Sequence, residues 1–121
     1  MKVTIIDDSK VMRAIVKRTL RQAGFNDVDV MEACDGEEGL QVIAESNPDL
    51  VLCDWNMPKM TGMELLERLR AEGNRVRFGF VTSEGSEEMR ARAREAGAAF
   101  LIAKPFKPED FRESIDKAMA A

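Results

Sequence analysis

The chain has 121 residues, of which 45% are hydrophobic and 33% charged, which predicts one globular domain with a buried core. The formal net charge of −4 and a pI near 5.0 do not favour nucleic-acid binding. No apolar run approaches the ~20 residues of a membrane span, and the N-terminus becomes acidic too early for a signal peptide. We therefore expect a cytoplasmic protein.

The sequence has no histidine and two cysteines, Cys34 and Cys53. The absence of histidine removes the usual zinc ligand and the usual general base. The two cysteines form no metal or redox motif. We interpret both as small buried residues in a reducing cytosol.

The hydrophobic pattern predicts five strands, each followed by a helix. A strand over residues 2–6 precedes a helix that begins at Ser9 and ends at Gly24. The second strand, which runs from residue 28 to residue 31 or 32, is interrupted by Asp29, which favours the edge of the sheet. The basic residues of the first helix are interpreted as a solvated face, and they are Lys10, Arg13, Lys17, Arg18 and Arg21.

The second helix opens at Asp35-Gly36 and ends at Asn47-Pro48. Residues 50–53 form an unbroken apolar run, which is typical of a strand buried on both faces of a parallel sheet. Thr61 and Glu64 have the spacing of a capping box, and the helix that follows them stops at Gly73.

Residues 78–81 predict the fourth strand, although Gly79 is unusual inside a strand. Either Ser83 or Ser86 begins the fourth helix, whose three arginines we also interpret as a solvated face: Arg90, Arg92 and Arg94. Residues 99–103 predict the fifth strand, and Pro108 begins the last helix.

Strands that alternate with helices predict an α/β fold, a doubly wound (βα)5 sandwich of the flavodoxin-like type. Right-handed crossovers leave few topologies. We expect the strand order 2-1-3-4-5, because the second strand is the most polar and the middle strands are the most apolar. The whole chain, residues 1–121, is predicted to form this single domain.

Polar residues stand at the carboxyl ends of four predicted strands, the place where ligands bind in open α/β sheets. They are Asp7, Asp8, Asp54, Asn56, Thr82 and Lys104. Three carboxylates in one crevice cannot all stay ionised without a partner. With no histidine available, the fitting partner is Mg²⁺, which takes carboxylates and completes its shell with water and phosphate oxygens. A phosphoryl group would find a point charge in Lys104, and a carboxylate can itself be the nucleophile.

These residues form a set of motifs: Asp7-Asp8, Asp54-Trp55-Asn56-Met57-Pro58, Thr82 and Lys104-Pro105-Phe106. The set resembles the receiver domains of two-component response regulators along the whole chain. Asp-Trp-Asn-Met-Pro together with Thr82-Ser83-Glu84 is most similar to the single-domain chemotaxis regulators of that family. Those regulators are a known example of the strand order 2-1-3-4-5, so the order is not an independent inference.

The resemblance implies that Asp54 accepts a phosphoryl group from the phosphohistidine of a sensor histidine kinase. Asp8, Asp54 and the carbonyl of Asn56 would hold Mg²⁺ directly, and Asp7 would hold it through water. The family pattern thus assigns one metal and one phosphoacceptor to the same rim of the sheet.

The resemblance also implies that Lys104 binds the phosphoryl oxygens and that Thr82 moves toward them. The Lys104–Pro105 peptide bond would be cis, while Asn56 and Glu84 would flank the phosphate and tune its hydrolysis. Together these roles describe a switch as well as a reaction site.

One position departs from the family pattern. Receivers usually carry a switching aromatic residue three positions before the lysine, where this chain has Leu101; the neighbouring Phe100 should point to the other face of the strand. The Thr82 part of the switch still carries over. The output is then a protein contact through the fourth helix, the fifth strand and the fifth helix.

We expect a stand-alone response regulator, with chemotaxis or flagellar motor control as its process. Its partners would be a sensor histidine kinase, a downstream protein such as the motor switch, and a phosphatase, and the chain would be a monomer that binds neither nucleic acid nor membrane. Roles as a phosphorelay intermediate or a phosphate sink stay open.

Two further classes fit the residues less well. An aspartate-nucleophile phosphatase usually has a second Asp two residues after the nucleophile, where this chain has Asn56. A flavodoxin-like electron carrier needs a Ser/Thr/Gly-rich phosphate loop after the first strand, where Asp7 and Asp8 would repel phosphate. We therefore expect a phosphoacceptor domain that promotes its own phosphorylation and dephosphorylation, not an enzyme.

Overall fold

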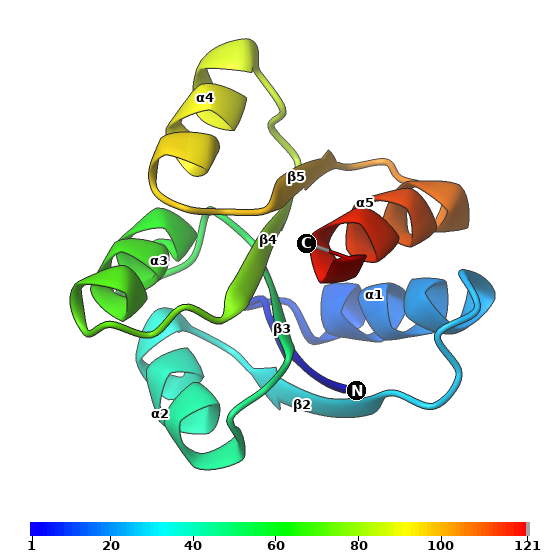
Figure 1. Ribbon diagram of the computed structural model, residues 1–121, viewed down its shortest axis with the longest axis horizontal. Helices are drawn as coiled ribbons and strands as arrows, with labels where there is room; N and C mark the ends of the chain where they lie inside the picture. The colour runs from blue at the N-terminus through cyan, green and yellow to red at the C-terminus, as the bar shows by residue number, and fades with distance from the viewer. Residues whose placement is uncertain (121) are drawn as a thin grey trace.

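The computed structural model describes residues 1–120, in which strands and helices alternate (Figure 1). The elements are β1 (Lys2–Ile6), α1 (Lys10–Gln22), β2 (Asp29–Ala33), α2 (Gly36–Ser46), β3 (Leu50–Cys53), α3 (Gly62–Ala71), β4 (Arg77–Thr82), α4 (Glu87–Glu95), β5 (Phe100–Ala103) and α5 (Pro108–Ala120). The predicted alternation is confirmed. The second strand begins and ends slightly later than predicted, because its pairing with β1 continues through Ala33.

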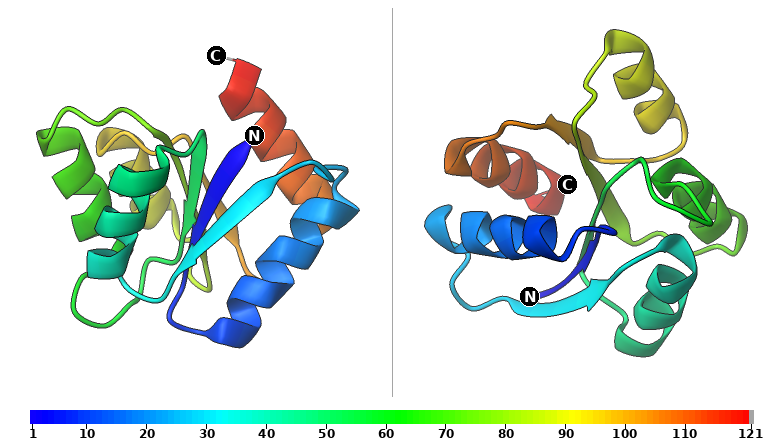
Figure 2. Two further views of the ribbon diagram at one scale, coloured as in Figure 1. Left: turned by 90° about the horizontal axis from the view of Figure 1, so that it is seen from below. Right: turned by 180° about the vertical axis from the view of Figure 1, so that it is seen from behind.

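The strands form one parallel sheet in the predicted order β2-β1-β3-β4-β5. The central strand β3 is buried at every residue, and the more polar β2 lies at an edge, as predicted. Helices α1 and α5 cover one face, while α2, α3 and α4 cover the other (Figure 1). Both views of Figure 2 show the sheet between these two layers.

Each face of the sheet has its own core. On one face Val16, Leu20, Phe111 and Ile115 pack on strand residues, and on the other face the helices contribute mainly leucines of α3. Consecutive strand residues point to opposite faces. Phe100 therefore packs toward α1 and α5, whereas Leu101 is buried on the α4 side, as predicted.

The helix N-termini lie where the sequence signals placed them. Ser9 and Asp35 cap α1 and α2, and Thr61 and Glu64 complete the capping box of α3. Of the two candidate serines for α4, Ser86 is the N-cap. Because each helix follows a parallel strand, these caps sit beyond the carboxyl ends of the strands, the edge at which the polar residues gather.

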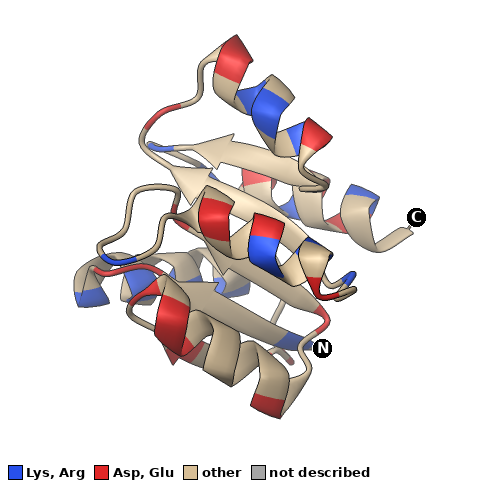
Figure 3. Cartoon of the chain, turned by 90° about the vertical axis from the view of Figure 1, so that its left-hand side faces the viewer, with Lys and Arg blue, Asp and Glu red and all other residues tan. Residues whose placement is uncertain are grey.

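The described helices include none that is long and apolar enough to cross a membrane. In Figure 3 the segments coloured for charged residues lie mainly on the helices and loops, and the strands are largely free of them. The acidic and basic residues are not evenly mixed: α1 contains basic residues and no acidic ones, and α2 contains glutamates and no basic residues.

The prediction for the cysteines is half right. Cys53 is buried in β3, but Cys34 is exposed. Cys34 follows the last residue of the edge strand β2, and its thiol donates to Oε2 of Glu38 at 3.5 Å. This hydrogen bond raises the pKa of the Cys34 thiol, and the negative charges of Glu38 and Asp35 raise it further, so the residue is not activated as a nucleophile.

Gly79 in β4 has a packing reason. It lies opposite Phe100 of β5, and a Cβ atom at position 79 would overlap the ring of Phe100. The glycine therefore gives the aromatic ring its place on the sheet, against the core formed with α1 and α5.

We predict that Gly79→Ala lowers the free energy of unfolding by about 1–3 kcal/mol, the usual cost of overpacking a core. Urea denaturation at 25 °C measures the change. Combining it with Phe100→Leu should recover part of the loss, because the smaller side chain removes the overlap. Equal stability of Gly79→Ala and the unsubstituted protein would contradict this account.

Candidate functional site

Main-chain hydrogen bonds fix three of the predicted site residues just beyond the strand ends. The N–H of Asp7 donates to Ala33 O at 3.1 Å, and the N–H of Asp54 donates to Ile6 O at 2.9 Å. The N–H of Lys104 likewise donates to Thr82 O at 2.8 Å. Each bond extends the parallel ladder past the assigned strand, so the three side chains start from one rigid edge of the sheet.

The carboxylates of Asp7, Asp8 and Asp54 converge at this edge, as predicted. Each offers an oxygen that lies within 4.8 Å of those of the other two. Asp7 is 4% exposed, Asp54 is partly buried and Asp8 is open to solvent. Three oxygen ligands of this kind form a donor set suited to a hard divalent cation.

Lys104 brings a positive charge to the same cluster. Its Nζ lies 3.5 Å from Oδ2 of Asp7 and 3.8 Å from Oδ2 of Asp54. Both separations are longer than a direct charge-assisted hydrogen bond of about 2.7–2.9 Å. The Lys104–Pro105 peptide bond is cis, as predicted.

The surroundings of Asp7 disfavour the ionised form of its carboxyl group. Burial raises its pKa above the ordinary 3.8, and the neighbouring Asp54 and Asp8 raise it further. A hydrogen bond of 2.9 Å from the N–H of Ser9 to Oδ1 and the charge of Lys104 act in the opposite direction but do not cancel the rise in pKa. The ionised carboxylate is therefore held in surroundings that favour its neutral form.

Thr82 is fully buried at the end of β4, and its hydroxyl has no hydrogen-bond partner among residues 1–120. An unpaired buried hydroxyl costs about 1–3 kcal/mol. The buried hydroxyl of Thr4 in β1 is unpaired among these residues as well, so the feature that distinguishes Thr82 is its place at the carboxyl end of β4, the edge where the acidic residues gather.

The other predicted residues lie in loops at this edge or on the flanking strand. Asn56 and Glu84 follow β3 and β4, and both side chains are exposed. The main-chain hydrogen bonds that involve the loops of residues 1–120 include none to the carbonyl oxygen of Asn56. This oxygen is therefore available as a ligand. Leu101 lies in the core next to α4. The roles proposed for Asn56, Glu84 and Leu101 stay predictions.

Sequence reasoning missed Gly62, which packs against the main chain of Asp54. Its N–H donates to Trp55 O at 2.8 Å, and a Cβ at this position would overlap the carbonyl oxygen of Asp54. The N-terminus of α3 thus lies directly against the acidic residue. A glycine straight after the capping threonine is the only sequence signal, and it does not reveal the distant contact.

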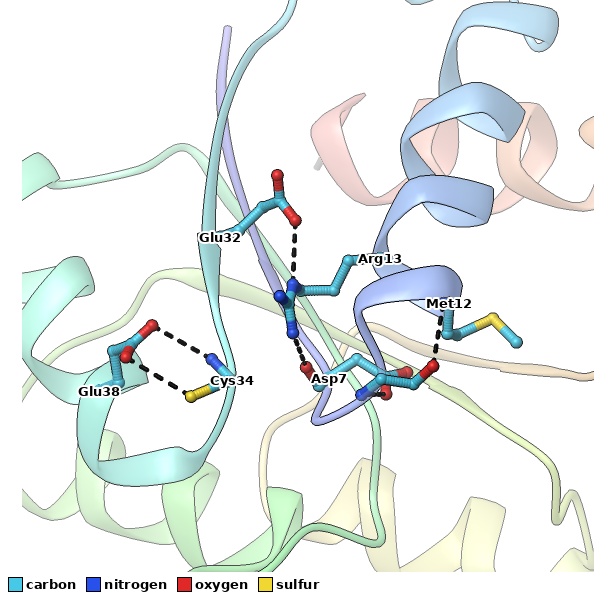
Figure 4. Close-up of polar contacts among 7 residues, drawn as sticks. Asp7, Met12, Arg13, Glu32, Cys34 and Glu38 are labelled. Carbon is cyan, nitrogen blue, oxygen red and sulfur yellow. Dashed lines mark hydrogen bonds and ion pairs between the residues drawn. The ribbon is translucent and has the colours of Figure 1, made fainter.

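The interpretation of the arginine faces was wrong for two residues. Arg13 of α1 is half-buried and donates from Nη1 to Asp7 O at 2.7 Å (Figure 4). Arg90 of α4 donates to Gly85 O at 3.2 Å and to Leu101 O at 2.9 Å, which ties the loop after β4 to the edge strand β5. Both guanidinium groups bind main-chain carbonyls in preference to solvent, and helical spacing alone does not indicate such contacts.

We predict that Asp7→Asn raises the free energy of unfolding of the metal-free protein at pH 7 by about 1 kcal/mol, the usual scale of a single substitution. The pKa of Asp7 is raised on folding, so its contribution favours the folded state below pH 3.8 and is lost as the pH rises. The amide removes this penalty at pH 7.

Chemical denaturation in EDTA, from pH 7 down toward pH 4, measures the difference between the two proteins. The difference in the free energy of unfolding should shrink as the pH falls, because Asp7 of the unsubstituted protein then binds a proton and, like the amide, carries no charge. Asp27→Asn, in an exposed loop, is the matched control and should change little. A destabilised Asp7→Asn protein at pH 7 would contradict the account.

Comparison with known proteins places this geometry in a family. The model of the response regulator receiver domain matches residues 3–116. Chemotaxis protein CheY-3 of Vibrio cholerae is 40% identical over 119 residues, covering 97% of this chain and 90% of that protein. Chemotaxis protein CheY of Pseudomonas aeruginosa is 37% identical, covering 97% of this chain and 94% of that protein.

Solved structures agree in fold. The chemotaxis response regulator CheY4 of Vibrio cholerae has a TM-score of 0.83 and 32% identity, and the match covers 97% of each chain. The receiver domain of the Francisella response regulator 1452 has a TM-score of 0.87 and 26% identity, covering 98% of this chain and 96% of that one. With a family model that matches nearly its whole length and chemotaxis relatives at this identity, the chain belongs to the response regulator receiver domain family.

Proposed function

We propose that the chain is a phosphorylation-controlled signalling module in which Asp54 accepts a phosphoryl group. The observation that carries the proposal is the convergence of Asp7, Asp8 and Asp54, with Lys104 next to two of these carboxylates. Phosphoryl transfer depends chiefly on positioning and on neutralising charge, and this site supplies both.

The donor set fits Mg²⁺, which prefers hard oxygen ligands and tolerates an open face. Asp8, Asp54 and the carbonyl of Asn56 would hold the ion directly, and Asp7 would hold it through water. When bound, Mg²⁺ would supply positive charge that neutralises the carboxylates and the phosphoryl oxygens.

In the transfer itself, a carboxylate oxygen of Asp54 attacks the phosphorus atom of the donor. With a phosphohistidine donor, the new O–P bond forms as the P–N bond breaks, and the electron pair leaves with the imidazole nitrogen, which then takes up a proton. No general base is needed, since the nucleophile is already a carboxylate. Lys104 lies close enough to move from its present carboxylate partners to the oxygens of the transferred group.

A protein donor also finds a suitable surface beside this lysine. Met12 and Ile15 of α1 and Pro105 and Phe106 of the loop before α5 line a shallow, mostly apolar depression next to Lys104. Apolar rims of this kind favour a protein over a small phosphoester as the donor. We infer that the donor is a sensor histidine kinase.

The switch would begin at Thr82. Its hydroxyl has no partner in the buried position, and a phosphoryl oxygen on Asp54 would supply one. Movement of Thr82 would pull on residues 83–86, whose Gly85 carbonyl is bound by Arg90 of α4. Because Arg90 also binds the carbonyl of Leu101, the change would reach the surface formed by α4, β5 and α5 without an aromatic residue at position 101.

We infer an output in chemotaxis or flagellar motor control, since the named relatives are chemotaxis proteins. A phosphorelay intermediate or a phosphate sink would use the same acceptor and stays the alternative. The site does not favour an aspartate-nucleophile phosphatase, because Asn56 occupies the position of that enzyme's second acid. We therefore propose a cytoplasmic, monomeric phosphoacceptor without a substrate of its own beyond the phosphoryl donor.

We predict that incubation with acetyl phosphate and MgCl2 adds one phosphoryl group, measured by intact mass spectrometry. Asp54→Asn should abolish this gain in mass, because an amide oxygen is not a nucleophile at neutral pH. Asp27→Asn, which removes a carboxylate from an exposed loop, should be labelled like the unsubstituted protein. Sustained turnover of acetyl phosphate by many equivalents per minute would instead favour the phosphatase.

We predict that Lys104→Ala still accepts the phosphoryl group but no longer transmits it. Hydrogen exchange of residues 83–95 should change on phosphorylation in the unsubstituted protein and stay unchanged in the variant, since the link between Lys104 and the phosphoryl oxygens is missing. Lys107→Ala, an exposed lysine of the same loop, is the control and should behave normally. A full exchange response in phosphorylated Lys104→Ala would refute the role given to Lys104.

A further inference from the structure

We propose that Arg13 is a positioning residue for the divalent-cation site, an inference that rests on the proposed metal-dependent function. Its guanidinium donates from Nη1 to Asp7 O at 2.7 Å and from Nε to Oε1 of Glu32 at 2.9 Å (Figure 4). The Arg13 side chain is 14% exposed. It lies between α1, the end of β1 and the edge strand β2, and it does not extend into solvent.

The accepting carbonyl is what links Arg13 to the metal ligands. This carbonyl belongs to the peptide group that joins Asp7 to Asp8, so its orientation sets how both residues leave β1. The N–H of Asp7 is already held by Ala33 O at 3.1 Å. With Arg13 on the carbonyl, both main-chain polar groups of Asp7 are fixed, and its Oδ1 is fixed as well by the N–H of Ser9.

An arginine suits this task better than a lysine. The planar guanidinium carries several N–H donors in fixed directions, so one group can bind a carbonyl and a carboxylate at the same time. Glu32, on the neighbouring strand β2, orients the guanidinium group. Its side chain is 41% exposed, so the ion pair with Arg13 contributes little stability by itself, and its effect lies in geometry.

Charge and geometry predict opposite outcomes when Arg13 is removed. A positive side chain near a cation site repels the cation, so on electrostatic grounds alone its loss would tighten Mg²⁺ binding. If Arg13 instead orients the Asp7–Asp8 peptide group, its loss weakens Mg²⁺ binding. The sign of the change in the dissociation constant therefore separates the two accounts.

The test is a titration with MgCl2 of the unphosphorylated protein, followed by the fluorescence of Trp55 and by amide chemical shifts of the acidic residues in NMR spectra. Trp55 is the single tryptophan and directly follows Asp54. We expect Arg13→Ala to raise the Mg²⁺ dissociation constant about tenfold, at the lower end of the usual effect of residues that support metal ligands. Arg13→Lys should also weaken binding, because it keeps the charge but loses the fork.

Two further variants complete the series. Arg18→Ala removes the same charge from an exposed position of α1 and should leave Mg²⁺ affinity within about twofold or tighten it slightly. Glu32→Ala leaves Arg13 in place without its orienting partner and should weaken binding a fewfold. Urea denaturation in EDTA reports whether each variant is folded before it is titrated, and Arg13→Lys, which keeps the charge, decides the matter if Arg13→Ala does not fold.

Several outcomes overturn the inference. Folded Arg13→Ala that binds Mg²⁺ as tightly as, or more tightly than, the unsubstituted protein leaves no positioning role for Arg13. Full Mg²⁺ affinity in both Arg13→Lys and Glu32→Ala refutes the claim that the guanidinium group must bind the Asp7 carbonyl and the Glu32 carboxylate at the same time. An unsubstituted protein that shows no response in either measurement up to millimolar MgCl2 overturns the proposed metal site itself, and this result is distinct from a failure confined to the Arg13 variants.

Discussion

The site depends on main-chain hydrogen bonds that hold like charges together. The N–H groups of Asp7 and Asp54 are bound to the carbonyls of Ala33 and Ile6, one step beyond the strands. Because the backbone itself is fixed, the carboxylates cannot relax apart when they repel each other. Burial raises the pKa of Asp7, and the neighbouring carboxylates of Asp54 and Asp8 raise it further. A fold that concentrates negative charge in this way creates a lasting demand for cations, which Lys104 meets only in part.

Much of this arrangement is visible in the sequence, because it follows from local patterns. Apolar runs of strand length that end in a polar residue identify the strands and the residues at their carboxyl ends, as with residues 50–53 and Asp54. Capping residues such as Ser9 and Thr61 mark where each helix begins. Parallel pairing then brings the strand ends to one edge, so the acidic cluster can be predicted without knowledge of any side-chain contact.

The remainder depends on how elements cross in space. Arg13 has the helical spacing of a solvated residue, yet the crossing of α1 over the end of β1 brings its guanidinium to a carbonyl. Gly62 looks like an ordinary first residue of a helix until α3 is seen to lie against Asp54. Cys34 looks buried by its position near a strand end, but it directly follows the edge strand β2 and its side chain is exposed. Long side chains and close main-chain contacts of this kind carry no periodic signal.

The residues around Asp54 fall into a rigid half and a movable half, and the chemistry of the two cations follows that division. On the β1 side, Arg13 holds a carbonyl at 2.7 Å in a fixed fork, which suits a group that must not move. On the β4–β5 side, Lys104 makes only long ion pairs, and the Thr82 hydroxyl has no partner within the described chain. A flexible ammonium and an unsatisfied hydroxyl can both gain by turning toward new oxygens at Asp54. Under the proposed function, this asymmetry would let the acidic half stay ready for a cation while the other half responds to phosphorylation, since a two-state change needs an element whose contacts improve in the second state.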